Sequence, residues 1–197
     1  KKTTKAEQRP LPLYMERTYR LDHKIWMIAW PAILSNISTP LLGLVDSAIL
    51  GHLDNVSYLG AVAIGAVLLS FLYWGFSFLR MGTTGIVARA TGAGDLPGAT
   101  LALYRSAVIA LGIALLVLLA SPWVLEMGFY LLSPQQELQE LANSYARIRI
   151  VSAPAVLLTY TIVGWFIGRQ DTRWPMAIMI TTNGINIALD FLFIMGL

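Results

Sequence analysis

The chain has 197 residues, of which 56% are hydrophobic and 13% are charged. A soluble globular domain has about 25% charged residues, so this composition excludes an ordinary soluble domain. The net charge of +3 says less than the positions of the charges, which are considered below. The chain has no cysteine, which excludes a disulfide framework, a structural zinc site with thiolate ligands and thiol chemistry.

Residues 1–22 are predicted to form a cytoplasmic N-terminal tail, and residues 23–197 a bundle of transmembrane helices. Five charge-poor stretches each have about the 20 residues that a helix needs to cross a hydrocarbon core of about 30 Å. They cover residues 25–51, 56–79, 102–125, 147–168 and 174–197. Their apolar runs are continuous and do not alternate, which favours helices over strands. The sequence therefore predicts an all-α, polytopic membrane helix bundle of about five spans.

Basic residues are distributed unevenly between the segments that flank these spans. Of the 14 Lys and Arg residues, 12 lie before the first span or in and next to the second and fourth connections, and only Arg147 and Arg149 lie next to the third. Basic residues accumulate on the cytoplasmic side of a membrane protein. The N-terminus is therefore predicted to be cytoplasmic.

The first span carries a polar stripe that ends in an acid. Asn36, Thr39, Gly43 and Asp46 are spaced three, four and three residues apart, which places them on one face of a helix. An aspartate at membrane depth costs about 2.5–3.5 kcal/mol. We therefore expect Asp46 to face a polar interior.

The fifth span carries a matching stripe of Asn183, Asn186 and Asp190. Asp190 lies roughly 24 Å beyond Trp174 at about 1.5 Å per residue, and Asp46 lies at similar or slightly greater depth. Burial in an apolar medium favours the neutral carboxyl group, so both acids are candidates for proton relay or cation binding in a shared cavity. The alternative is that both acids are structural, hydrogen-bonded to neighbouring helices or at the water interface.

Two prolines lie in the first span. A proline removes a backbone donor and bends a helix. For Pro31 a tolerated bend and a hinge that responds to protonation of Asp46 both stay open, whereas for Pro40 a tolerated bend is favoured. Gly164 and Gly168 form a small-xxx-small pair, which predicts close helix packing. The sequence has no Ser/His/Asp or metal-ligand constellation, so an enzyme is not expected.

Four stretches resemble the multidrug and toxic compound extrusion (MATE) transporter family. They are residues 31–51 of the first span, the turn at residues 87–95, the glycine-aspartate-threonine turn at residues 168–176 and the motif at residues 186–190. The resemblance is closest to the DNA-damage-inducible DinF-like branch of the bacterial members. It covers nearly all of the chain after the N-terminal tail.

The resemblance implies a fold of twelve helices in two six-helix lobes, of which this chain matches about five helices of the N-terminal lobe. The rest of that protein, with its C-terminal lobe, would then be a partner. Such transporters export lipophilic, often cationic aromatic molecules in exchange for protons or sodium ions, and bacterial members do so across the inner membrane. The resemblance implies no nucleic acid and no cofactor other than the coupling ion, H⁺ or Na⁺.

The resemblance also assigns roles to residues of this chain. It implies coupling roles for Asp46, Asn186 and Asp190, and a bending role for Pro31. We expect the other polar residues of the two stripes, Asn36, Thr39 and Asn183, to line the substrate cavity.

The predicted function is proton-coupled efflux of many drugs. Three alternatives stay open. The first is sodium-coupled drug antiport through the same acids and asparagines. The second is a flippase for lipid-linked precursors from the related superfamily, whose cavity would be ringed by arginines. The third is a membrane scaffold that transports nothing, for which the change Asp46→Asn would be harmless.

Overall fold

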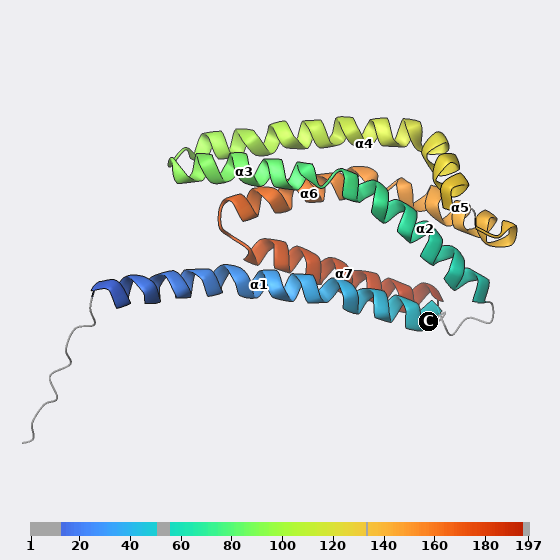
Figure 1. Cartoon of the computed structure of the whole chain (residues 1–197), viewed down its shortest axis with the longest axis horizontal. Helices are drawn as coiled ribbons and strands as arrows, with labels where there is room; N and C mark the ends of the chain where they lie inside the picture. The colour runs from blue at the N-terminus through green and yellow to red at the C-terminus, as the bar shows by residue number, and fades with distance from the viewer. Residues whose placement is uncertain (1–12, 51–55, 133, 195–197) are drawn as a thin grey trace, which may run out of the picture.

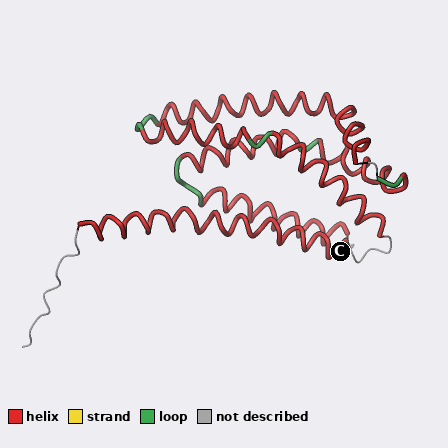
Figure 2. Tube along the Cα trace, in the orientation of Figure 1, coloured by secondary structure: helices red, strands yellow, loops and turns green. Residues whose placement is uncertain are grey.

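The computed structural model describes residues 13–50, 56–132 and 134–194, and all regular structure in these ranges is helical (Figure 2). The helices, in chain order, are α1 (Leu13–Leu50), α2 (Val56–Gly75), α3 (Phe78–Gly92), α4 (Leu96–Leu132), α5 (Gln136–Ile150), α6 (Ala153–Gly168) and α7 (Arg173–Ile194). The predicted all-α class is confirmed. Helices suit this composition because they satisfy every backbone hydrogen bond within the segment, which lipid requires.

Four segments are long and apolar enough to cross a membrane. They are Ile25–Val45 within α1, Ser57–Gly92 across α2 and α3, Leu96–Leu132 of α4 and Arg173–Phe193 of α7. A fifth span forms if Leu138–Ile150 and Ala153–Gly168, which meet at a bend of 54°, are counted together. The predicted bundle of about five membrane spans is therefore confirmed.

The helices extend beyond the predicted spans. Helix α1 begins at Leu13, inside the predicted tail, and α3 continues to Gly92 through Arg80 and Arg89. Both arginine side chains are exposed. The predicted second span ends at Leu79, before Arg80, but an exposed charged side chain leaves the backbone hydrogen bonds of a helix intact. Helix ends depend on turn chemistry instead.

The turn between α3 and α4 shows this chemistry. Gly94 has φ of 74°, in the left-handed region that glycine adopts without steric cost. The next N–H, of Asp95, donates back to the carbonyl of Ala90 at 2.9 Å. Asp95 then caps α4, because its carboxylate accepts the backbone N–H of Gly98 at 2.8 Å. Glycine and aspartate therefore end one helix and begin the next within a few residues.

The helices form two layers (Figure 1). Helices α1 and α7 lie side by side in one layer, while α3, α4 and α6 pack together in the other. Helices α2 and α5 pack on each other at the end of the bundle away from the α3–α4 turn. The α1–α7 pair therefore makes most of its contacts within itself, and its contacts with the other helices are sparse.

Helices α3 and α6 approach closely at the predicted small-residue pair. A Cβ atom added at Gly164 would lie 2.6 Å from the carbonyl oxygen of Arg80, and one at Gly168 would lie 2.8 Å from that of Thr84. The hydroxyl of Thr84 also donates to the carbonyl of Gly164 at 3.1 Å. The prediction that this pair serves close helix packing is confirmed, because only glycine leaves room for the facing backbone.

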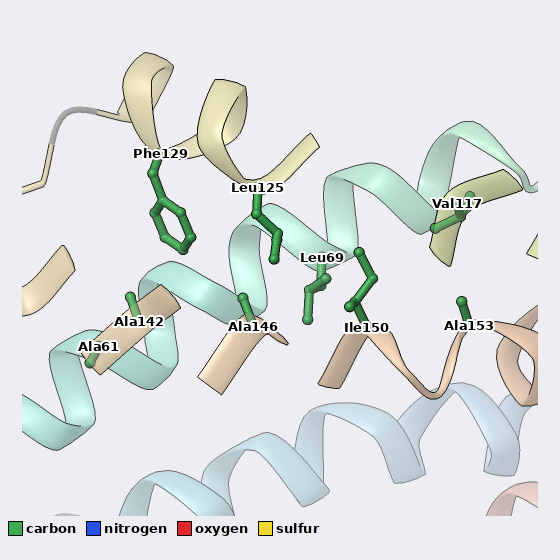
Figure 3. Close-up of a cluster of buried hydrophobic side chains, with 9 residues drawn as sticks. All are labelled: Ala61, Leu69, Val117, Leu125, Phe129, Ala142, Ala146, Ile150 and Ala153. Atoms are coloured by element: carbon green, nitrogen blue, oxygen red, sulfur yellow. The ribbon is translucent and has the colours of Figure 1, made fainter. Parts of the chain in front are cut away.

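A hydrophobic core lies where α2, α4, α5 and the start of α6 meet (Figure 3). Its larger members point toward one another in the figure, and small residues of α2, α5 and α6 fill the space beside them. The nine residues are Ala61, Leu69, Val117, Leu125, Phe129, Ala142, Ala146, Ile150 and Ala153. The bend between α5 and α6 is therefore held within the core.

The close approach of α3 and α6 predicts opposite effects for one substitution at two glycines. Gly164→Ala should lower the free energy of unfolding by about 1–3 kcal/mol, because the new methyl group meets a backbone that cannot move aside. Gly112→Ala on α4 is the control. A Cβ there meets no atom within 4 Å, so alanine should raise stability by about 0.5–1 kcal/mol. Thermal unfolding in detergent measures both; equal effects would contradict the close contact.

Candidate functional site

Helices α1 and α7 carry all the predicted site residues. Those on α1 are Pro31, Asn36, Thr39 and Asp46, and those on α7 are Asn183, Asn186 and Asp190. The two helices pack along each other over most of their length (Figure 1). The candidate site is therefore the α1–α7 pair.

Among the described residues, two hydrogen bonds join α1 to α7 and to the residue just before it. Near its start, the hydroxyl of Thr172 donates to the backbone carbonyl of Ile28 at 3.0 Å. Further along, the amide of Asn183 donates to the hydroxyl oxygen of Ser38 at 2.6 Å. Sequence number increases in the same direction along both helices between these two bonds, so α1 and α7 are parallel.

These bonds fix the register of the pair. They join residues that are 144 and 145 positions apart in the sequence. Asp46 and Asp190 are also 144 positions apart. Because both helices rise about 1.5 Å per residue, this register sets positions 46 and 190 at the same level along the pair.

The polar residues of the two stripes differ in their surroundings. Asn36 is exposed, and its amide donates to the carbonyl of Ala32 in its own helix at 2.9 Å. Asn183 faces α1, while Asn186 and Asp190 are half-buried on α7. The side chains of Thr39 and Asp46 lie outside the described part of the structure. A chamber shared by Asp46 and Asp190 therefore stays a prediction.

Helix α1 continues through both of its prolines. Pro31 is buried and lies between the two residues of α1 that bond to α7, whereas Pro40 is exposed and lies beyond them. A bend at Pro31 would therefore separate the two bonded parts of α1. A bend at Pro40 would leave both bonds in place.

Ser38 is not among the residues predicted from the sequence, because it is not on the stripe that leads to Asp46. One signal could have found it. Ser38 lies seven residues after Pro31, which puts both residues on the same side of a helix after two turns. Pro31 is buried and Ser38 bonds to α7, so this second stripe faces the partner helix.

The connection between α6 and α7 holds the start of α7. Trp165 donates its indole N–H to the carbonyl of Ala99 on α4 at 3.0 Å, and the guanidinium of Arg169 lies 4.5 Å from the centre of the Trp165 ring. Phe166 stacks on Trp174 with ring centres 6.0 Å apart. These contacts attach the first turn of α7 to the other layer.

The other surface features that could form a site do not contain the predicted site residues. An open depression on α4 is lined by Tyr104, Arg105, Val108 and Ile109, and it contains none of the predicted site residues. Within residues 13–50, 56–132 and 134–194, no three His, Asp or Glu side chains are grouped as a metal ion would require. The α1–α7 pair is therefore the feature on which a function can be argued.

Comparison with known proteins identifies the family. The model of the MatE family matches residues 31–192, which is most of the chain. The chain belongs to the MatE family. The match includes both helices of the candidate site, and it confirms the resemblance to MATE transporters drawn from the motifs.

Relatives and solved structures agree with this assignment. The chain is 40% identical over 176 residues to the DNA damage-inducible protein F of Escherichia coli (strain K12), covering 89% of this chain and 38% of that protein. It is 25% identical over 185 residues to a probable multidrug resistance protein NorM of Thermotoga maritima, covering 92% of this chain and 39% of that protein. The chain thus spans about two fifths of the length of these relatives.

One solved structure is that of a multidrug resistance MATE family transporter of the MOP superfamily in an outward-facing conformation. It superposes with a TM-score of 0.79 at 24% identity, over 87% of this chain and 38% of that one. This similarity establishes the fold of this MatE chain as that of part of a MATE transporter.

The hydroxyl of Thr172 should stabilise the packing of α7 on α1. Thr172→Val keeps the shape of the side chain and removes the donor to Ile28, so it should lower the free energy of unfolding by about 1 kcal/mol. Thr100→Val is the matched control, because in the described part of the chain the hydroxyl of Thr100 bonds to Leu96 of its own helix. Thermal unfolding in detergent measures both. A loss of stability no larger than that of the control would contradict a stabilising role for the hydrogen bond from Thr172 to Ile28.

Proposed function

We propose that this MatE chain forms part of the N-terminal lobe of a transporter that exports lipophilic, often cationic aromatic molecules in exchange for protons. The observation that carries the proposal is the register of α1 and α7. It sets two aspartates at one level of an apolar helix pair. Acids at membrane depth are costly, and they are typically found where ions or protons pass.

The arrangement of the pair supports coupling through both acids. Asp190 is half-buried and lies one helical turn beyond Asn186, which is also half-buried. Position 46 lies at the same level on the adjacent helix. A proton on either carboxyl group would turn it from an acceptor into a donor, which would change the hydrogen bonds that it can form with the adjacent helix.

The proposed mechanism begins with a proton entering from outside. It neutralises Asp46, changes the hydrogen bonding around that residue and bends α1 near Pro31. The bend narrows the cavity between the helices of the lobe and expels the bound drug. Coupling requires that the proton and the drug prefer different conformations, because a ligand with equal affinity for both shifts nothing.

The ends of the helices support the proposed orientation. Exposed basic side chains lie near the end of α3, in the first third of α4 and where α6 meets α7, toward the end of the bundle where Trp165 binds α4. They are Arg89, Arg105, Arg169 and Arg173. By the positive-inside rule this end is cytoplasmic, in a bacterial inner membrane. Helices α1 and α7 then both run outward, which puts the acids nearer the outer surface.

The names of the relatives support a drug as the cargo, since five of them are called probable multidrug resistance proteins. Sodium coupling is the second candidate. Asn186 and Asp190 offer amide and carboxylate oxygens one turn apart, which are ligands that a hard cation accepts.

Efflux from cells that produce the natural protein from its complete gene tests the proposal. Asp46→Asn and Asp190→Asn should each reduce drug efflux at least about tenfold with normal insertion, because an amide cannot carry the proton. Asp22→Asn is the matched control, because Asp22 is exposed and lies before the apolar span. It should leave efflux unchanged.

The same assay distinguishes the ions when it is run across a range of pH with and without sodium. Efflux that follows the proton gradient in sodium-free medium supports the proposal. Efflux that requires sodium favours the second candidate. Full efflux by Asp46→Asn, with the protein in the membrane, would contradict both and favour a scaffold.

A further inference from the structure

We infer that the hydrogen bond between Ser38 and Asn183 is a latch that holds α1 straight against α7 and must open when α1 bends at Pro31. Ser38 and Asn183 are thus positioning residues for the transport cycle. The inference rests on the proposed function, because it concerns the bend proposed to couple proton and drug. Its structural part can be tested without transport.

The two hydrogen bonds that hold α1 to α7, here called tethers, lie on opposite sides of Pro31. Ile28, which accepts the hydroxyl of Thr172, lies three residues before Pro31, and Ser38 lies seven residues after it. One tether is therefore on each side of the proposed hinge. The tether at Ile28 keeps the inner part of α1 in place on α7, and the tether at Ser38 holds the outer part, which carries Asp46.

The distance from Pro31 to Ser38 is long enough that a bend at Pro31 breaks the hydrogen bond of Ser38. Ser38 lies about 10 Å beyond Pro31 along the helix. A kink of about 20° would displace it by roughly 4 Å, which is more than a hydrogen bond can absorb. The bond of 2.6 Å to Asn183 would break, whereas the bond at Ile28 lies before the hinge and would persist.

The chemistry of the pair suits a latch. A bond between a neutral hydroxyl and a neutral amide within a membrane is modest, so its loss changes a conformational ratio by about three- to tenfold. Such a bond biases α1 toward the straight form without locking it. A charged pair in the same place would be far harder to separate in an apolar medium.

Distances between spin labels test the latch in the purified natural protein, without any transported drug. Leu44 and Leu189 are exposed and lie beyond the hinge, so cysteines there report the outer parts of α1 and α7. Met27 and Ala177 are both exposed and provide a control pair of labels, because Met27 lies before Pro31 and Ala177 lies on α7, which the proposed bend leaves in place.

The labels at positions 44 and 189 should show one distance for the straight form of α1 and a second for the bent form. Ser38→Ala should raise the ratio of the bent to the straight population by about three- to tenfold, because the straight form loses its bond. The distance of the inner pair should stay unchanged. Ser38→Thr, which keeps the hydroxyl, should restore the original ratio. Ser106→Ala is the matched control, because among the described residues the hydroxyl of Ser106 bonds to Leu103 in its own helix. An outer distance unchanged in Ser38→Ala would overturn the latch.

A cross-link gives the second test. In Ser38→Cys combined with Asn183→Cys, a short thiol-specific cross-linker should stop efflux and abolish the label distance that belongs to the bent form. Cleavage of the linker should restore both efflux and that distance. These 197 residues contain no cysteine, and any cysteine elsewhere in the natural protein is replaced first. Full efflux by the cross-linked protein would overturn the latch. If no variant or wild type transports drug, the proposed function fails, and the spin-label distances still decide the latch.

Discussion

The hydrogen bonds that fix α7 against α1 are the constraint on which the functional account depends. Thr172 binds the backbone at Ile28, and Asn183 binds Ser38, so the two helices are held parallel in one register. A slip of one turn would separate the levels of Asp46 and Asp190 by about 5.4 Å. Because the register holds, two acids that are far apart in the sequence come to one level of the membrane.

The rest of the bundle supports this pair. Glycines at 164 and 168 let α6 lie against α3, and Trp165 fixes the end of α6 to α4, so the connection into α7 has a defined position. The core among α2, α4, α5 and α6 is packed with aliphatic and small side chains and with the ring of Phe129 (Figure 3). The α1–α7 pair makes few contacts with this part, so the proposed bend of α1 would disturb few of them.

The sequence predicted the helical class, the membrane spans and the packing role of Gly164 and Gly168, because apolar periodicity and small residues act locally. It did not predict where α3 and α4 extend, because exposed arginines such as Arg80 do not end a helix. Nor did it find Ser38, whose role depends on the register of a helix more than a hundred residues away. The stripes of Asn36 and Asn183 were visible in the sequence, but only the structure separates an asparagine that bonds within its own helix from one that bonds across the pair.

The most direct test is a cross-link between the acid positions themselves. Asp46→Cys combined with Asp190→Cys, in membranes, should react with a short water-soluble thiol cross-linker to join α1 to α7, because the account places both side chains in one wet space. Asp46→Cys combined with Asp22→Cys, which lie on one helix far apart, should not be bridged by the same reagent. Efficient joining of positions 46 and 190 is the predicted result. The contradicting result is that positions 46 and 190 are not joined and that each cysteine alone reacts only with lipid-soluble reagents, which would mean that both side chains face lipid.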